Sequence, residues 1–358
     1  MNFSDENMDI KSHSDVALKR RREAARKRRE KERRMALLRL ILRAVAFITA
    51  IVLVVILITK GCKSDESLEN DVSSNASALD AETDVNNEPR VSLPTEATTM
   101  TTLGTDINSS FAAVLNLNTN QITASKNLHA RMYPASTTKI MTAIVAYENA
   151  SSLDATFTMT TELIDPLYRA EATLAGFVDG ESVTVRDLLY GTILPSGAEA
   201  AEGVAIATAG SIENFLQLMN QKVQELGLKN THFSNVTGLH DTANYSTAYD
   251  MAVILKAAMD VPFLREVLSA YKYTTAPTAQ HPEGIELTGT LFSYMYGSEP
   301  EGADILGGKT GYVYESGYCI ASFGSAASGT EYICVTANAE SRWPAVYDQI
   351  NIYSTYAK

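Results

Sequence analysis

The feature of this 358-residue chain that most restricts its fold is a basic run followed at once by an apolar segment. Residues 19–34 hold eleven Lys or Arg against three Glu, and Ala36–Thr59 is interrupted only by Arg39 and Arg43. A bilayer span needs about 20 mostly apolar residues, and arginines near its end can extend their side chains to the interface. We therefore expect residues 36–60 to be one transmembrane signal anchor.

The charge beside this segment predicts its orientation. Cationic flanks stay in the cytoplasm, so we expect residues 1–35 inside the cell and the chain beyond residue 60 outside it. Residues 61–105 are rich in Ser, Thr, Asn, Asp and Glu, and from residue 64 to 105 there is no aromatic side chain. Such a composition buries too little apolar surface to offset the entropy of ordering, so we predict an acidic, disordered linker.

Residues 106–358 are expected to form one domain with a core of its own. From residue 64 onward, fourteen Lys and Arg face thirty-five Asp and Glu, a balance of −21. An acidic body of this kind argues against the binding of nucleic acid. The basic run alone could be a nucleic-acid patch, but its position beside an apolar segment favours a role in membrane topology.

The hydrophobic patterns of the outer domain predict strands at both of its ends and helices between them. A sheet built from both ends, with a mainly helical region inserted, gives an α+β fold with an antiparallel sheet flanked by helices. The predicted strands are 111–117, 121–125, 317–323 and 331–338, and the predicted helices begin near 136 or span 213–226, 247–259 and the segment around 343–350.

Two cysteines, Cys319 and Cys334, fall on the last two predicted strands. A disulfide could form outside the cell, but the geometry of neighbouring strands rarely suits the bond. We expect two buried free thiols instead.

Three short motifs carry the chemistry, and the first is Ser136-Thr137-Thr138-Lys139. Residues three apart on a helix share a face, so a hydroxyl and an amine lie side by side. A serine becomes a nucleophile when an adjacent base takes its proton, and a lysine can do this when burial lowers its pKa. Alone, this spacing also fits a helix cap beside a solvated amine.

The second motif is Ser196-Gly197-Ala198, and the third is Lys309-Thr310-Gly311. A glycine in a strand lets another backbone or a ligand approach closely, and a cation with a hydroxyl beside it suits a carboxylate. Each motif alone is more often a loop or a strand end.

Together and in this order, the motifs match the signature of penicillin-binding proteins and class A β-lactamases. The sequence resembles the serine-type D-Ala-D-Ala carboxypeptidases, the low-molecular-mass penicillin-binding proteins of the peptidase S11 family, over roughly residues 106–358. The resemblance implies a β-lactamase/transpeptidase-like domain with a mainly helical subdomain. The segments that carry it are Tyr133–Ala143, Asn235–Leu239, Tyr245–Asp250 and Gly308–Tyr318.

The resemblance also implies a role for each motif residue. Ser136 would attack the carbonyl between two terminal D-alanines of a peptidoglycan stem peptide, with Lys139 as general base, and Ser196 would relay a proton toward the leaving amine. The third motif would bind substrate: Lys309 and Thr310 hold its carboxylate, as they would that of a β-lactam antibiotic. The backbone N–H groups of Ser136 and of Tyr312, which follows Gly311, would form the oxyanion hole.

The sequence departs from the family at Ala198, where Asn is usual. If the amide interaction were lost, about 1–3 kcal/mol would be lost with it, which favours a slower enzyme. A non-catalytic penicillin-binding wall protein therefore stays open as an alternative, and so does an endopeptidase acting on cross-links. A β-lactamase is a further alternative, although the sequence has no Glu-x-x-Leu-Asn between its motifs.

Two further features bear on the site. Arg342 follows the last predicted strand, where similar enzymes often have a basic group that reaches the substrate carboxylate, and a surface arginine at the start of the final helix is the alternative. The histidines are scattered, without His-Glu-x-x-His or paired-cysteine spacing, which argues against a zinc peptidase. No metal and no cofactor are expected.

Overall fold

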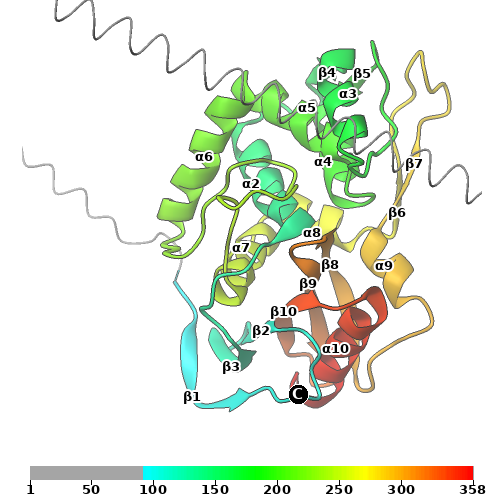
Figure 1. Ribbon diagram of the computed structural model, residues 1–358. Coiled ribbons are helices and arrows are strands. Elements are labelled where there is room, and N and C mark those ends of the chain that lie inside the picture. Colours follow the sequence, from blue (N-terminus) through cyan, green and yellow to red (C-terminus); the bar gives the residue numbers. More distant parts are fainter. Residues whose placement is uncertain (1–91, 358) are drawn as a thin grey trace, which may run out of the picture. The chain divides into compact units, whose positions relative to one another are not determined.

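The computed structural model describes residues 92–357, and its centre is a six-stranded sheet of order β1-β3-β2-β10-β9-β8 (Figure 1). The pairing of β2 with β10, in which Val114 lies opposite Cys334, joins the two ends of the domain in one sheet. The predicted closure of the sheet by both ends of the domain is therefore confirmed. The strands are β1 (Thr95–Thr102), β2 (Phe111–Asn116), β3 (Gln121–Lys126), β8 (Ala303–Val313), β9 (Gly317–Ala326) and β10 (Glu331–Ala339).

Two predictions about this sheet were wrong. The linker was predicted to extend to residue 105, but β1 is an ordered strand that pairs with β3. Its threonines are β-branched and suit a strand, and an edge strand needs little apolar burial because its neighbour satisfies its backbone. The β1–β3 pairing is parallel, so the sheet is mixed rather than antiparallel.

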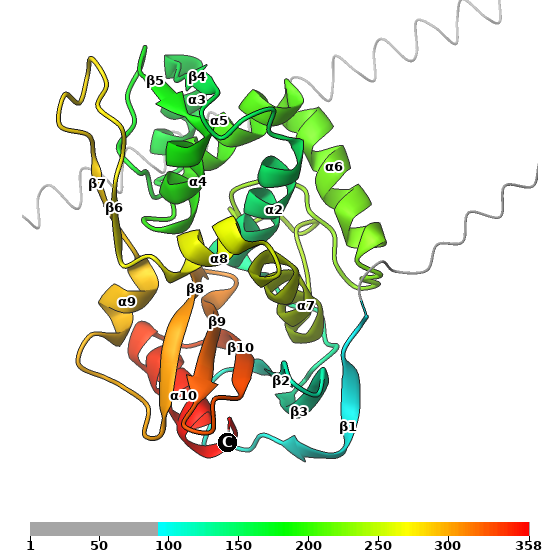
Figure 2. The ribbon, with the colours of Figure 1, turned by 180° about the vertical axis from the view of Figure 1, so that it is seen from behind.

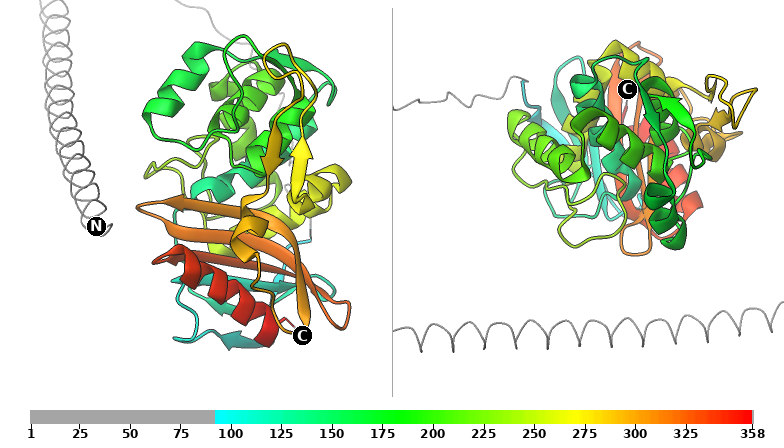
Figure 3. Two further views of the ribbon diagram at one scale, coloured as in Figure 1. Left: turned by 90° about the vertical axis from the view of Figure 1, so that its right-hand side faces the viewer. Right: turned by 90° about the horizontal axis from the view of Figure 1, so that it is seen from above.

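Helices cover both faces of the sheet. On one face, α7 (Ala248–Met259) packs against β2, β9 and β10, and α8 (Pro262–Ser269) packs against β8. On the other face lie α10 (Arg342–Thr355) and the short α9 (Thr290–Met295), which share an apolar cluster with Ile320 of β9. Figures 2 and 3 show the sheet between these layers, with α10 in red on one side.

The remaining helices form the inserted, mainly helical region, as predicted. Its helices are the 3₁₀ turn η1 (Ala135–Thr138), α2 (Lys139–Asn149), α3 (Thr161–Arg169), α4 (Val185–Ile193), α5 (Ala198–Ala209) and α6 (Ile212–Glu225). Two small antiparallel pairs accompany them: β4 (Thr156–Thr158) with β5 (Ser182–Thr184), and β6 (Lys272–Thr274) with β7 (Glu286–Thr288). The helix α2 is apolar nearly all round and is buried at the centre, in contact with α4, α5, α6 and α7.

The two cysteines of the sheet are free and buried. Cys334 lies opposite Ser322, not Cys319, and the two thiols belong to different apolar clusters on opposite faces of the sheet. Successive side chains along a strand point to opposite faces, and Cys319 is three residues from the partner of Cys334, so the two thiols lie on opposite faces and cannot form a bond.

The predicted cytoplasmic segment, the anchor at 36–60 and most of the linker lie outside the described residues. Within 92–357, no helix has both the length and the apolar character that a membrane span requires.

Candidate active site

The first motif begins on a strained turn. Ala135 has a φ of +47°. This left-handed conformation is strained for any residue other than glycine, and such strain clusters at functional sites. Ser136 follows in η1, and Lys139 is the first residue of α2. The Lys139 Nζ lies 3.2 Å from the Ser136 Oγ, as the three-residue spacing predicts.

Lys139 is buried beneath the serine. Its side chain is 2 % exposed, and burial lowers the pKa of its amine from 10.5 to about 7, against the opposing charges of Glu199 and Glu202. The amine also donates a hydrogen bond of 2.6 Å to the Thr237 carbonyl. A neutral amine held this way keeps a lone pair that can accept the proton of Ser136, so the arrangement suits a general base.

The Thr237 carbonyl is placed by a tight loop organised by Asn235. The Asn235 Oδ1 accepts hydrogen bonds from the backbone N–H groups of Thr237 and Gly238, at 3.2 and 2.7 Å, and its Nδ2 donates to the Leu239 carbonyl at 2.9 Å. This is the asparagine-centred turn that such a side chain favours. The loop therefore fixes the base without contributing a side chain to it.

The third motif runs along β8, the edge strand of the sheet, beside the nucleophile. A Cβ on Gly311 would lie 2.8 Å from the Ser136 backbone nitrogen, so glycine is required for the strand to approach this closely. An edge strand leaves backbone N–H and C=O groups free to pair with a peptide. Tyr312 is half exposed, and its ring centroid lies 4.4 Å from that of Tyr318.

The side chains of Lys309 and Thr310 in this motif are held by hydrogen bonds within the protein. Lys309 is 1 % exposed and donates a 2.8 Å hydrogen bond to the Thr310 carbonyl. Burial, and then the charge of Lys139, lower the pKa of Lys309 well below its usual range. The Thr310 hydroxyl lies 2.8 Å from the hydroxyl of Thr290, the first residue of α9.

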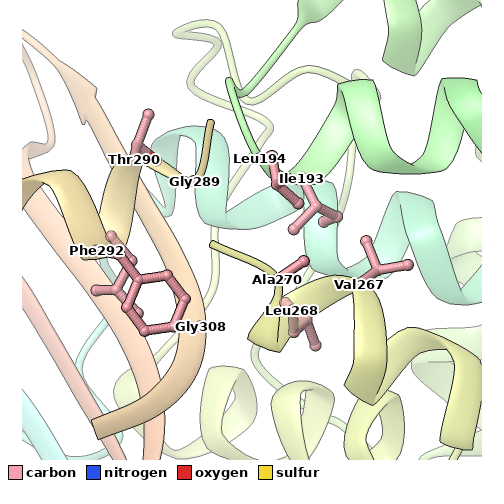
Figure 4. A pocket seen from close by; sticks show the side chains of 10 residues that line it. Ile193, Leu194, Val267, Leu268, Ala270, Gly289, Thr290, Phe292 and Gly308 are labelled. Atoms are coloured by element: carbon pink, nitrogen blue, oxygen red, sulfur yellow. The ribbon is translucent and has the colours of Figure 1, made fainter. Parts of the chain in front are cut away.

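Thr290 also joins the third motif to the loop of the second. Its backbone N–H donates a 3.0 Å hydrogen bond to the carbonyl of Leu194, two residues before Ser196. Figure 4 shows the small pocket at this junction, where Thr290 and Phe292 lie across from Ile193 and Leu194. Thr290 is the only polar side chain in the lining of this pocket.

The second motif lies between α4 and α5. Ser196 is buried, with a φ of +70°. Ala198 is the first residue of α5, and its backbone N–H donates to the Thr173 carbonyl at 2.8 Å. The first turn of α5 brings Glu199 close enough to act on Lys139, which places this motif beside the nucleophile.

The match to a family model for D-alanyl-D-alanine carboxypeptidase, peptidase S11, covers residues 96–341. The chain belongs to this family. It is 32% identical over 213 residues to the D-alanyl-D-alanine carboxypeptidase DacF of Bacillus subtilis, covering 58% of this chain and 52% of that protein. It is 33% identical over 228 residues to the D-alanyl-D-alanine carboxypeptidase of Streptomyces sp. strain K15, covering 62% of this chain and 77% of that protein.

Solved structures of the family share the fold. The crystal structure of the Streptomyces K15 DD-transpeptidase superimposes with a TM-score of 0.61 at 30% identity, covering 74% of this chain and 99% of that one. Penicillin-binding protein 5 of Haemophilus influenzae gives a TM-score of 0.58 at 25% identity, covering 68% and 69%. Against some curated relatives, such as DacF, this chain spans about half of their length.

Sequence reasoning missed two contributors to this family site. Thr237 acts through its backbone carbonyl, and Thr290 acts on Thr310 from a separate helix. The resemblance at Asn235–Leu239 was a signal for the first. Nothing in the sequence around Thr290 pointed to the second.

Arg342 is exposed, and its guanidinium lies over the rings of Tyr294 and Trp343, at 5.2 and 5.4 Å from their centroids. Among the residues that the structure describes, no group of three or more His, Cys, Asp or Glu side chains could hold a metal ion.

Proposed function

We propose that this protein is a serine D-Ala-D-Ala carboxypeptidase that removes the terminal D-alanine from peptidoglycan stem pentapeptides through an acyl-enzyme on Ser136. The observation that carries the proposal is the buried Lys139 amine, whose pKa is lowered to about 7 and whose Nζ lies 3.2 Å from the Ser136 Oγ. A base of this pKa is half neutral near pH 7, where it can take the hydroxyl proton.

In the proposed reaction, Ser136 attacks the carbonyl carbon between the two D-alanines as Lys139 accepts its proton. The oxyanion forms between the backbone N–H groups of Ser136 and Tyr312, a kind of donor whose loss costs about 2.7–4 kcal/mol. The C–N bond then breaks, and a proton passes by way of Ser196 to the leaving amine. Water hydrolyses the resulting ester and restores the hydroxyl of Ser136.

Lys309 and Thr310 are proposed to hold the substrate carboxylate, which β-lactams also carry. Lys309 is desolvated without a counter-ion in the described residues, and an entering carboxylate favours its charged form. The Thr310 hydroxyl forms one hydrogen bond with the Thr290 hydroxyl, which holds it in place for the substrate. The free edge of β8 offers its backbone to the peptide. Ala198 in place of Asn favours a slower turnover than in relatives that keep the amide.

We further propose that residues 36–60 anchor the protein in the cell membrane as a single span, with the N-terminus in the cytoplasm and the catalytic domain outside. The basic run before an apolar segment supports this orientation. Outside the membrane, the enzyme would meet its peptidoglycan substrate.

Labelling with a fluorescent penicillin, followed by assay of D-alanine release from a stem pentapeptide, tests the proposed activity. We expect covalent labelling of the full-length chain, its loss in Ser136→Ala, and its retention in the control Ser211→Ala, where the hydroxyl only caps α6. Full labelling of Ser136→Ala would contradict the assigned nucleophile. Rapid turnover of penicillin would indicate a β-lactamase, and labelling without D-alanine release a non-catalytic wall protein.

A further inference from the structure

A stretch without regular secondary structure, residues 172–178, crosses the second motif, and we call it the crossing segment. Its Thr173 carbonyl accepts the N–H of Ala198 at 2.8 Å. A Cβ on Gly197 would lie 2.7 Å from the Cβ of Ala175, so the segment packs directly on the glycine of the motif. The position of this segment and the position of the second motif are therefore linked.

The carboxylate of Glu199 forms hydrogen bonds with the backbone in the middle of the crossing segment, and we call these two bonds the tie. Its Oε1 accepts hydrogen bonds from the N–H groups of Ala175 at 2.6 Å and Gly176 at 2.8 Å. Glu199 is completely buried, and within residues 92–357 its Oε2 has no hydrogen-bond partner. Buried polar atoms without a partner are rare and call for an explanation. A carboxylate that served only as a tie would cost less as a neutral amide.

Glu199 is also near enough to the catalytic amine for its charge to raise the pKa of Lys139. Burial raises the pKa of Glu199 itself, and the hydrogen bonds from the Gly176 and Ala175 backbone N–H groups oppose that rise. The charged groups that act on Lys139 and its surroundings are Glu199 and Glu202 of α5 and the neighbouring Lys309 of β8. A negative charge beside an amine favours its protonated form, whereas burial opposes it. The charge of Glu199 thus keeps Lys139 from losing its proton too readily and preserves its strength as a base.

We propose that Glu199 is a positioning residue with two tasks: it fixes the crossing segment on the second motif, and it holds a negative charge beside the Lys139 amine. The proposal rests on the function proposed above, in which Lys139 is the general base. The two tasks can be separated by substitution, because an amide keeps an oxygen that accepts both backbone N–H groups but carries no charge.

A second buried glutamate provides a matched comparison at the end of the same segment. Glu181 is completely buried, and its Oε2 accepts the N–H of Val178 at 2.9 Å. Its Oε1 accepts from Thr278 and lies 2.8 Å from the His281 Nδ1, so both of its oxygens are engaged. Glu181 is not among the charges that act on Lys139. It therefore holds the segment without affecting the base.

The test uses two measurements between pH 5 and 9. NMR of the full-length chain with ¹³C-labelled lysine monitors the titration of the Lys139 side chain, and a kinetic assay gives the rate of acylation by benzylpenicillin. Glu199→Gln can still accept both hydrogen bonds but carries no charge. We expect it to lower the midpoint of both profiles by about one pH unit. Glu181→Gln should leave both midpoints unchanged.

Hydrogen exchange at Ala175 and Gly176 tests the tie to the crossing segment. Glu199→Asp keeps the charge on a shorter side chain, so we expect at least tenfold faster exchange at these two amides, while Glu199→Gln keeps them protected. An unchanged Lys139 midpoint in Glu199→Gln overturns the electrostatic task, and unchanged exchange in Glu199→Asp overturns the tie.

If Glu199→Gln does not fold, Glu202→Gln takes its place for the charge. It removes the second carboxylate that acts on Lys139 and should lower the midpoint in the same direction. Because the NMR titration does not require acylation, a protein that is never acylated by penicillin would refute the proposed function without deciding the role of Glu199.

Discussion

The backbone of Gly238 lies against the carbonyl of Ala135, so closely that a Cβ at Gly238 would come within 1.9 Å of the carbonyl oxygen. Gly238 has a φ of +77° and Ala135 a φ of +47°. The Asn235 loop thus positions Lys139 through the Thr237 carbonyl and, one residue later, supports the strained turn that presents Ser136.

Gly238→Ala is expected to displace this turn. The three nearest atoms that a Cβ at Gly238 would meet belong to the backbone of Ala135 and Ser136, so no flexible side chain can yield and Ser136 must shift relative to Lys139. A misplacement of about 1 Å can cost on the order of 100-fold in rate. We expect acylation by benzylpenicillin to slow by about this factor, measured as the second-order rate constant.

Gly210→Ala is the control for the backbone conformation alone. Gly210 has nearly the same φ, +79°, but a Cβ there would meet no atom within 4 Å. It should lose about 1–2 kcal/mol of stability and acylate at the rate of the unaltered chain. Equal acylation rates in both variants would show that the contact with Ala135 does not matter to the nucleophile.

The pH dependence of acylation should follow the Lys139 amine. Burial lowers its pKa to about 7, so the amine is charged and inactive as a base below this pH and neutral above it. The rate of acylation should therefore rise as the pH increases through 7 and level off near pH 8. Lys139→Arg, which stays charged throughout this range, should not acylate measurably. A flat rate between pH 5.5 and 8.5 would contradict the role of Lys139.

The sequence predicted the parts of the site whose partners are close along the chain. Ser136 and Lys139 are three residues apart, and helical geometry alone brings them together. Four strands of the central sheet, β2, β3, β9 and β10, were predicted within a few residues, because each is a short apolar run beside turn residues. The edge strand β8 and the short strands β4–β7 were not predicted. β1 was missed, since its apolar residues Ala97 and Met100 are only partly buried and its stability comes from pairing with β3.

The contacts that the sequence could not reveal join distant residues through backbone atoms or through unremarkable side chains. Thr237 is 98 residues from Lys139 and acts through a carbonyl that every residue possesses. The orientation of Glu199 depends on the crossing segment, whose course no local pattern determines. The segment Asn235–Leu239 carried a family resemblance, but the resemblance did not reveal which group its loop would hold.

Thr290 offers a test of how the third motif is held. Thr290→Val keeps the shape of the side chain but removes the hydroxyl that engages Thr310. A hydrogen bond of this kind contributes about 1 kcal/mol, so we expect kcat/KM for a stem pentapeptide to fall about fivefold, mainly through KM. Thr290→Ser keeps the hydroxyl and should stay near the original value. A purely structural role would lower the melting temperature of Thr290→Val without raising KM.

Asp348 should dominate the attachment of the segment before β2 to the final helix. Its carboxylate is completely buried in α10 and accepts four hydrogen bonds, from the backbone N–H and the side chains of Asn108 and Ser109, at 2.6–3.0 Å. Asp348→Ala leaves the buried backbone N–H and hydroxyl of Ser109 without their acceptor. Since each such buried group costs about 1–3 kcal/mol, the free energy of unfolding should fall by about 2–6 kcal/mol.

Asp106→Ala is the matched control for Asp348→Ala, because it removes a carboxylate from the same segment at an exposed position. The Asp106 Oδ2 lies 3.2 Å from the Tyr356 hydroxyl and 3.4 Å from the Asn351 Nδ2. Exposed polar contacts contribute little, so its loss should cost less than about 1 kcal/mol. Urea unfolding of the full-length chain measures both variants. Equal losses would mean that the segment is held by its apolar residue Ile107, which is 1 % exposed, and not by Asp348.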